Sequence, residues 1–393
     1  MSEIIEKIKS VNKIALLFSI LMVSRALGFL PSKIPSAIEY TGVISMSLFC
    51  FYKQTHIEKI YIILFIYFLL NIFLLDINPM FQPWSRYIYF ITLLLCVSST
   101  LQSEYLRKVR HDILFITLSA CIILSTLTFF CWFLGVNFMK AQYLDITKAG
   151  SYSGLFNHSM VMGPVAGVSS LVLFYKFFKG GNWLYLLLAL ICIGSMFFSA
   201  SRTAFVCTLS SLFIIIIIIK TDKYKFRRNL LLITVGLIIS YPLWKDVTSM
   251  MVEKQTNNID SGSTFASRES VWNARIEEFK SSPAFGIGFC SVDPSRSMFS
   301  EGGTIEPGSS WLAILSMTGI IGFIITTTIF VKSFYYSIRN GGDNSLLTGL
   351  LLFFFLHMIT EGYIFSGGSF LCFFLWIIVG CCFDKKYEII DEE

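Results

Sequence analysis

Long apolar runs dominate the pattern of hydrophobic and polar positions along this chain. Each run is long enough to cross the ~30 Å hydrocarbon core of a bilayer as a helix. The runs lack the alternation of apolar and polar residues that the strands of a membrane β-barrel require. We therefore predict an all-α integral membrane protein with about twelve transmembrane helices, at residues 14–30, 37–52, 60–75, 87–101, 113–134, 159–175, 183–198, 204–219, 229–244, 311–331, 345–360 and 368–383.

The composition excludes the main classes of water-soluble protein. Of the 393 residues, 55% are hydrophobic and only 14% are charged, whereas a soluble domain carries roughly 25% charged residues. Most of the surface could not be solvated, which rules out a soluble enzyme, a nucleic-acid-binding domain and a disordered protein. Nearly all of the 10 cysteines lie in apolar runs without CxxC spacing, so neither a disulfide scaffold nor a zinc site is expected.

The distribution of Lys and Arg predicts the orientation in the membrane. With the N-terminus in the cytoplasm, the cytoplasmic loops hold most of these cations, including Lys220, Lys223, Lys225, Arg227 and Arg228. Short loops rich in Lys and Arg stay in the cytoplasm. We therefore expect both termini in the cytoplasm and an even number of spans.

The same orientation makes a prediction about thiol labelling. Cys290 falls in the loop that faces the outside, whereas Cys381 and Cys382 fall at the cytoplasmic end of the last span. A membrane-impermeant thiol reagent is expected to reach Cys290 and to leave the other two cysteines unlabelled.

One connection is far longer than the others. Residues 245–310 form a large outer loop between spans 9 and 10, and loops of this length are usually functional. Within it, an amphipathic helix is predicted from about Ser267, a suitable N-cap, to Lys280, and Pro283 ends it. The chain thus divides into three parts: helices 1–9 in residues 1–244, the loop in residues 245–310, and helices 10–12 with a cytoplasmic tail in residues 311–393.

Arg202 is the strongest candidate for chemistry at the outer face. It lies in the sequence Ser-Ala-Ser-Arg-Thr-Ala between two apolar spans, where its small neighbours leave room for a ligand. A guanidinium presents five N–H donors in a fixed fork that suits phosphate. The alternative interpretation is an interfacial arginine that extends to the lipid headgroups.

Two further arginines mark the helix of the long loop. Arg268 and Arg275 are seven residues apart, so they share one helix face, with Trp272 between them. This face could bind an anionic substrate. The alternative is a solvated face on which acidic neighbours pair with the arginines, the candidates being Glu269, Glu277 and Glu278.

Other polar residues at the outer side are weaker candidates for substrate binding. Arg25 and Arg86 lie near the outer ends of spans, where a headgroup anchor is the alternative. His158 begins span 6 and could accept a proton, or it could be an ordinary polar residue at a helix start.

Two carboxylates lie close to the outer face. Glu306 is the carboxylate of a Gly/Pro/Ser stretch before span 10 and is a candidate general base, although it could be only a loop residue. Glu361 lies one turn after His357 near the outer end of span 11, and we interpret these two residues as a structural pair.

Several motifs in this order resemble a known family. They are Ser201-Arg202-Thr203-Ala204, Ser267-Arg268 with Trp272, the stretch from Ser282 to Phe289 with Gly286 and Gly288, and Leu312, Leu315 and Gly319. This set is similar to the O-antigen polymerase and O-antigen ligase superfamily, the Wzy and WaaL type enzymes of bacterial polysaccharide synthesis.

The resemblance implies a glycosyltransferase of the bacterial inner membrane with a GT-C-like arrangement of helices, in which the large loop of residues 245–310 would be periplasmic. Its donor would be a glycan on undecaprenyl diphosphate, presented at the periplasmic face, and Arg202 and Arg268 would handle the diphosphate. Trp272 could stack on sugar rings, and Gly286 and Gly288 are candidate substrate-binding positions. The expected partners are the lipid-linked donor and acceptor, membrane lipid and, as a candidate, a chain-length regulator protein; no nucleic acid is expected.

One departure favours polymerase over ligase. Ligases carry His-Asn just before span 10, where this chain has Gly308-Ser309, so Glu306 is the nearby ionisable group. The polymer could be O-antigen, exopolysaccharide or capsule. A ligase that transfers glycan to lipid A core, and a transporter or flippase of lipid-linked repeats, remain as alternatives. No nucleotide-binding motif and no carboxylate pair with metal-ligand spacing occurs, so we expect metal-independent transfer without a cofactor.

Overall fold

The computed structural model describes residues 11–30, 35–77, 82–139, 152–219, 268–293, 308–339 and 344–392, together with residues 227, 231, 235, 256 and 295. Every predicted span coincides with a helix except 229–244, which lies outside the described ranges. The helices are α2 (Lys13–Ser24), α3 (Ser36–Lys53), α4 (Lys59–Leu74), α5 (Pro83–Val97), α6 (Glu104–Phe133), α7 (Ser159–Phe178), α8 (Trp183–Phe198), α9 (Arg202–Ile218), α12 (Arg268–Ser281), α13 (Ser310–Arg339), α14 (Ser345–His357) and α15 (Phe370–Glu392).

The all-helical prediction is confirmed, whereas the number of membrane crossings is not decided by helix length. Among the described residues, three helices are long and apolar enough to cross a bilayer: α6, α7 and α13. Seven further apolar helices or helix segments among the described residues are shorter, at 10–17 residues. The predicted count of twelve spans therefore stays a prediction.

Side-chain caps determine where several helices begin. The side chains of Asn12, Ser103, His158 and Asn182 each accept a hydrogen bond from a backbone N–H in the first turn of the helix that follows. These bonds satisfy donors that a helix start otherwise leaves unpaired. Helix α5 begins instead with Pro83, whose missing N–H costs nothing at that position.

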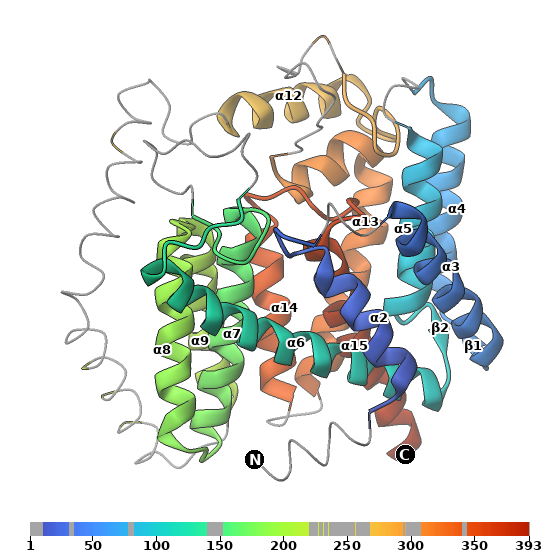
Figure 1. The fold of residues 1–393 in the computed structure, drawn as a ribbon. Helices are drawn as coiled ribbons and strands as arrows, with labels where there is room; N and C mark the ends of the chain where they lie inside the picture. Colours follow the sequence, from blue (N-terminus) through green and yellow to red (C-terminus); the bar gives the residue numbers. More distant parts are fainter. Residues whose placement is uncertain are drawn as a thin grey trace.

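The helices form a bundle around α13 and α15 (Figure 1). Helices α7, α8, α9 and α14 pack together on one side, and α3, α4 and α5 lie on the other, while α2 packs along α6. Helix α15 contacts α13, α14, α6 and α5, and its residues from Phe370 to Asp384 are buried. An apolar helix surrounded in this way forms the core of the bundle.

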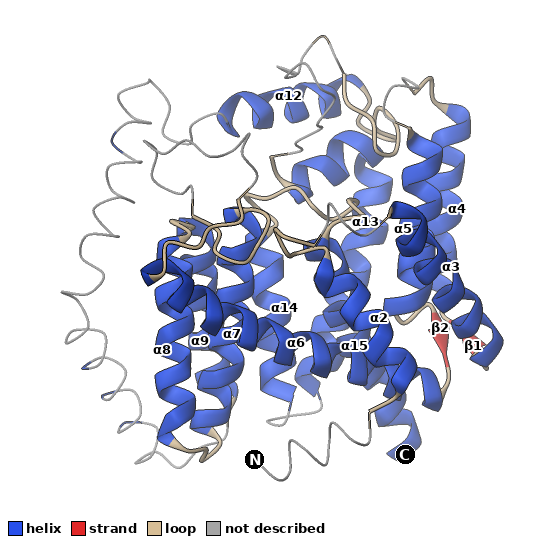
Figure 2. Cartoon of the chain, in the orientation of Figure 1, coloured by secondary structure: helices blue, strands red, loops and turns tan. Residues whose placement is uncertain are grey.

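The two ends of the bundle differ. At one end, which we call the α12 end, α12 packs against α13 and lies above the connection between α14 and α15 (Figure 1). At the other end, which we call the sheet end, β1 (His56–Ile57) pairs antiparallel with β2 (Leu101–Gln102), drawn in red in Figure 2. This two-residue ribbon is too short for its sequence to have predicted it.

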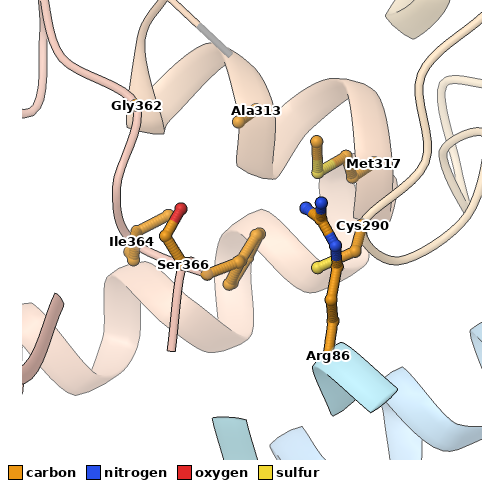
Figure 3. Close-up of a pocket in the computed structure, with 8 residues that line it drawn as sticks. Arg86, Cys290, Ala313, Met317, Gly362, Ile364 and Ser366 are labelled. Atoms are coloured by element: carbon orange, nitrogen blue, oxygen red, sulfur yellow. The ribbon is translucent and has the colours of Figure 1, made fainter. Parts of the chain in front are cut away.

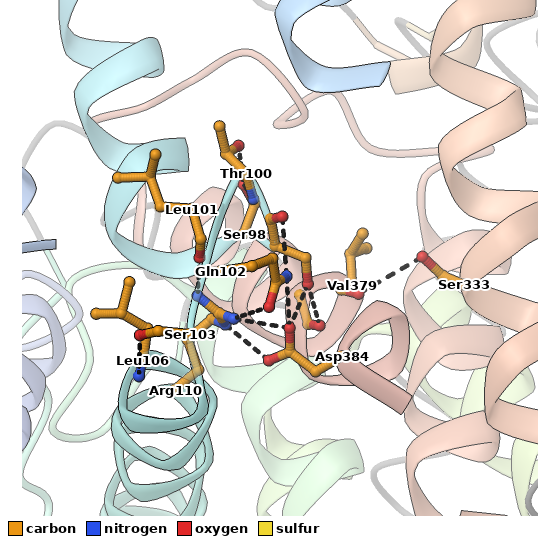
Figure 4. Close-up of polar contacts among 12 residues, drawn as sticks. Ser98, Thr100, Leu101, Gln102, Ser103, Leu106, Arg110, Ser333, Val379 and Asp384 are labelled. Atoms are coloured by element: carbon orange, nitrogen blue, oxygen red, sulfur yellow. Dashed lines mark hydrogen bonds and ion pairs between the residues drawn. The ribbon is translucent and has the colours of Figure 1, made fainter. Parts of the chain in front are cut away.

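A buried ionic network fixes the sheet end (Figure 4). The Asp384 carboxylate accepts hydrogen bonds from Arg110 Nε and Nη2, each 2.7 Å long, and from Ser99 Oγ at 2.7 Å and Gln102 Nε2 at 2.9 Å. Arg110 and Asp384 are 1% and 0% exposed. Burying an ion pair is favourable only when such additional bonds satisfy both groups. This network ties α6, β2 and α15 together.

The structure contradicts our expectation for Cys290. This residue is only 3% exposed, and burial raises the pKa of its thiol to about 12. A buried thiol that stays protonated at neutral pH reacts poorly with alkylating reagents. Cys290 is therefore unsuitable as a probe of orientation, whichever side of the membrane the α12 end faces.

Two introduced cysteines give a direct test of the orientation. The side chain of Lys280 on α12 is 64% exposed, and Tyr52 at the sheet end is 80% exposed. In a Cys131→Ser background, which removes the one native cysteine that is not buried, we expect an impermeant maleimide added to intact cells to label Lys280→Cys. Tyr52→Cys should react only after the membrane is permeabilised, and its labelling in intact cells would reverse the proposed orientation.

Candidate active site

The turn between α8 and α9 positions Arg202. Ala200 adopts a left-handed conformation with φ 50°, and its N–H donates to the carbonyl of Phe197 at 2.8 Å. Gly163 of α7 packs so closely against the turn that a Cβ there would lie 2.5 Å from the Cβ of Ser201. The turn is therefore tight, and it places Arg202, half-buried, at the first position of α9.

Arg202 and Arg268 approach each other at the α12 end. Arg268 is the first described residue of α12, with a side chain that is 29% exposed. Burial and the charge of Arg268 lower the pKa of Arg202. Two neighbouring cations repel each other unless an anion or a carboxylate compensates them. The two arginines of the family-like motifs are thus brought together, as an anion-binding site requires.

Glu361 supplies a compensating charge. Its carboxylate forms an ion pair with Arg268 Nη2, and its side chain is 9% exposed. It lies on the connection between α14 and α15, at the α12 end of the bundle. Sequence reasoning noticed Glu361 but missed this partner, because Arg268 is 93 residues away in the chain.

The α14–α15 connection also contacts the helix that carries Arg202. Thr360 Oγ1 donates to Thr203 Oγ1 at 3.1 Å. His357, which we expected to pair with Glu361, has Nδ1 3.2 Å from the hydroxyl of Tyr363. The connection therefore joins α9 and α12, and the histidine contributes to its internal packing.

Helix α12 is held against the bundle through one face. Trp272 Nε1 donates to the Gly308 carbonyl at 3.1 Å. Arg275 forms a buried ion pair with Glu278 at 3.0 Å, and Glu278 Oε1 accepts from the N–H of Asp293 at 2.8 Å. Burial lowers the pKa of Arg275 and raises the pKa of Glu278.

These contacts give Arg275 a role different from that of Arg268. The side chain of Arg275 is 1% exposed, so it presents almost no surface to a substrate. Of the acidic neighbours that we considered as partners, Glu278 pairs with Arg275. The pair is buried, whereas our alternative interpretation placed it on a solvated face. Arg268 and Arg275 share a face, as predicted, but only Arg268 reaches the site near Arg202.

A break in α13 receives the segment that follows α12. Gly319 leaves the helical conformation with φ 63° and ψ −170°, which frees backbone groups on both sides of it. The N–H of Ile320 donates to the carbonyl of Pro283 at 2.9 Å, and the carbonyl of Ser316 accepts from the N–H of Ile287 at 2.8 Å. The segment and the helix thus exchange hydrogen bonds in both directions.

Gly286 and Gly288, which we expected to bind substrate, take part in this exchange. Gly286 has φ 76°, and a Cβ there would overlap the backbone of Met317. The N–H of Gly288 donates to the Met317 carbonyl at 3.0 Å. Gly286 is therefore explained by the close approach of two backbones, and Gly288 by its φ of 118° and by the Ile77 side chain, which would lie 2.4 Å from a Cβ there.

Arg25 and His158 also lie at the α12 end, each with a protein partner. Arg25 forms an ion pair with Glu39, whose carboxylate in turn accepts a hydrogen bond from the Tyr89 hydroxyl. His158 Nδ1 accepts from the N–H of Met160 at 3.0 Å, so it acts as the N-cap of α7. This is the role that our alternative interpretation gave it.

Arg86 extends into a cavity at the same end (Figure 3). The cavity encloses about 330 Å³, part of it open to solvent. Its lining is mostly apolar, and its residues are Arg86, Cys290, Ala313, Met317, Gly362, Ile364, Phe365 and Ser366. Glu306 and Ser267 lie outside the described residues, and within those residues no three His, Cys, Asp or Glu side chains are placed to hold a metal ion.

The site lies within a segment that resembles a known family. Residues 187–327 match the family model described as O-antigen ligase. The match spans α8 to most of α13 and includes Arg202, Arg268 and Gly319, but it ends before Glu361. It supports a relationship to the O-antigen ligase and polymerase superfamily, and with the apolar helices it indicates an integral membrane protein. No curated protein matches the chain.

The break in α13 leads to a prediction about stability. Gly319→Ala should destabilise the protein by about 1–3 kcal/mol, because an alanine is strained at this positive φ and its Cβ would overlap the backbone of Ala284. The measurement is the thermal unfolding midpoint of the purified protein in detergent.

Gly135→Ala is the matched control. Gly135 has φ 68°, but no heavy atom would lie within 4 Å of a Cβ there, so this variant carries only the backbone strain of ~1 kcal/mol. If both variants lowered the unfolding midpoint equally, the contact between Gly319 and the segment after α12 would have no special importance.

Proposed function

We propose that this protein polymerises undecaprenyl-diphosphate-linked oligosaccharide repeats at the periplasmic face of the inner membrane. The observation that carries the proposal is that the α14–α15 connection binds both Thr203, next to Arg202 at the start of α9, and Arg268 of α12, so that the two arginines lie at one end of an apolar helical bundle. Paired guanidinium groups at a membrane surface suit a lipid diphosphate. The family match over residues 187–327 supports the same class of substrate.

The proposed reaction is a glycosyl transfer. The bond between the anomeric carbon of the donor and its phosphate oxygen breaks, and undecaprenyl diphosphate leaves with the bonding electrons. The anomeric carbon forms a new bond to a hydroxyl oxygen of the acceptor, whose proton passes to a base. Arg202 and Arg268 stabilise the negative charge that develops on the leaving diphosphate, which is electrostatic preorganisation.

Glu306 remains our proposed general base. It stands two residues before Gly308, the carbonyl of which binds Trp272 of α12. A carboxylate so close in the chain to a residue held against α12 can reach an acceptor sugar bound beside the two arginines. It would accept the hydroxyl proton or orient the hydroxyl by hydrogen bonding.

The ligase is the second candidate, because the matching family model is described as O-antigen ligase. The position at which ligases carry His-Asn is occupied here by Gly308 and Ser309. Gly308 has φ 68°, and a Cβ there would lie 2.8 Å from Val271 Cγ1 of α12. A histidine at this position would be both strained and crowded, which favours the polymerase.

A transporter of lipid-linked repeats is the weakest candidate. A transport path needs an interior that can open to both sides of the membrane. Here the central helix α15 is buried among its neighbours, and the satisfied Arg110–Asp384 network holds α6 to α15 at the sheet end. Both features argue for a site that works from the α12 end alone.

Replacing Arg202 tests the proposed function. In a strain that lacks the native gene, Arg202→Ala should leave surface glycan that carries a single repeat, because loss of one charge-stabilising donor lowers the rate by about 10²–10³-fold. Arg202→Lys should restore only part of the long-chain product, since an ammonium lacks the bidentate fork. The measurement is the banding of surface polysaccharide on gels.

Arg339→Ala, at the sheet end of α13, is the control and should give the native banding pattern. Loss of all glycan-capped core would indicate a ligase, and loss of lipid-linked repeats from the outer leaflet would indicate a flippase. Normal long chains from Arg202→Ala, at normal protein abundance, would count against the site.

Replacing Glu306 tests the base. Glu306→Gln should lower the rate of polymerisation by about 10²-fold or more if the carboxylate accepts the proton, while donor binding persists. Glu301→Gln, in the same stretch of the chain, is the control. A fully active Glu306→Gln combined with an inactive Glu306→Ala would instead assign Glu306 to orienting the acceptor.

A further inference from the structure

We infer that Glu361 is a positioning residue for Arg268. Its carboxylate holds the Arg268 guanidinium beside Arg202, so that both cations face one diphosphate group. The inference deepens the proposed function and rests on it for the identity of the ligand, a lipid-linked diphosphate. Neither the family match, which ends at residue 327, nor the sequence motifs include Glu361.

The geometry of the ion pair leaves Arg268 available to a ligand. The contact uses one nitrogen of the guanidinium, Nη2, whereas an arginine carries five N–H donors. The side chain of Arg268 is 29% exposed and that of Glu361 only 9%. The carboxylate therefore lies behind the guanidinium, and Arg268 can keep this partner while it donates to phosphate oxygens from its exposed side.

The carboxylate is attached to a fixed part of the backbone. The carbonyl of Glu361 accepts hydrogen bonds from the N–H of Ser310 at 3.0 Å and from its Oγ at 2.7 Å. The neighbouring Thr360 donates to Thr203, the residue after Arg202. Glu361 is thus held relative to the start of α13 and to the helix that carries Arg202.

A fixed negative charge is what two neighbouring arginines require. The charges of Arg202 and Arg268 repel each other, and an arginine side chain has a long, flexible stem that can carry its head into water. Without the Glu361 carboxylate, Arg268 would turn away from Arg202 whenever the site is empty. Diphosphate binding would then include the cost of bringing the side chain back.

Binding of a soluble lipid diphosphate tests this inference without relying on polymerisation. With the purified full-length protein in detergent and farnesyl diphosphate as the probe, Glu361→Gln should raise the dissociation constant by about tenfold, or about 1.4 kcal/mol. The number of binding sites and the thermal unfolding midpoint should stay the same. Glu277→Gln is the control, because Glu277 is a 55% exposed carboxylate on α12 that pairs with Lys280.

An unchanged dissociation constant for Glu361→Gln would overturn the inference. Fewer binding sites with an unchanged dissociation constant would also overturn it, because this is the signature of a residue that only supports the fold. A complete lack of farnesyl diphosphate binding by the unaltered protein would overturn it as well.

A double-mutant cycle separates positioning from direct catalysis. If Glu361 acts through Arg268, then Glu361→Gln should have no further effect on binding or on chain length in an Arg268→Ala background. A further loss of about tenfold in that background would overturn the inference, since Glu361 would then act on the substrate by itself.

The two proposals can fail separately. If Glu361 controls binding of the probe but deletion of the gene leaves long-chain polysaccharide intact, the polymerase proposal fails and the positioning role stands. If deletion yields single-repeat glycan but Glu361→Gln binds the probe normally, the polymerase stands and the positioning role fails.

Discussion

The exchange of backbone hydrogen bonds at the break in α13 is the constraint on which the site depends. Gly319 opens the helix, and the segment that follows α12 fills the opening from both directions. Because these hydrogen bonds join main-chain groups, they fix the position of the segment along α13. Helix α12, and with it Arg268, is thereby placed over the ends of the other helices, although a long stretch of chain separates it from α9.

The two ends of the bundle treat charge in opposite ways. At the sheet end, Arg110 and Asp384 are fully buried, and further donors saturate the carboxylate. At the α12 end, the Glu361 carboxylate pairs with Arg268, and Arg268 and Arg202 are both partly exposed. Removing one partner of a buried, saturated ion pair is strongly destabilising, whereas partly exposed cations at a surface attract an anion. The first arrangement suits an anchor and the second suits a binding site.

Local patterns in the sequence predicted the elements, and tertiary contacts determined what the residues do. Apolar runs and helical periodicity were enough to predict the helices, including α12 and the shared face of Arg268 and Arg275. They could not reveal that Arg275 is buried against Glu278, that Gly286 serves a backbone contact, or that Glu361 pairs with Arg268. Each of these depends on which helices become neighbours, and the hydrophobic pattern of one segment does not encode its neighbours.

The place of Glu361 near the end of the chain has a consequence for biogenesis. The chain is synthesised from the N-terminus, so α9 and α12, which carry Arg202 and Arg268, are made before α14 and α15. Until the connection between α14 and α15 is in place, Arg268 lacks the Glu361 carboxylate as its partner. A nascent or truncated chain that ends before Glu361 would therefore carry both arginines without the ion pair that fixes Arg268, and the arrangement of the candidate site would be completed only when synthesis is almost finished.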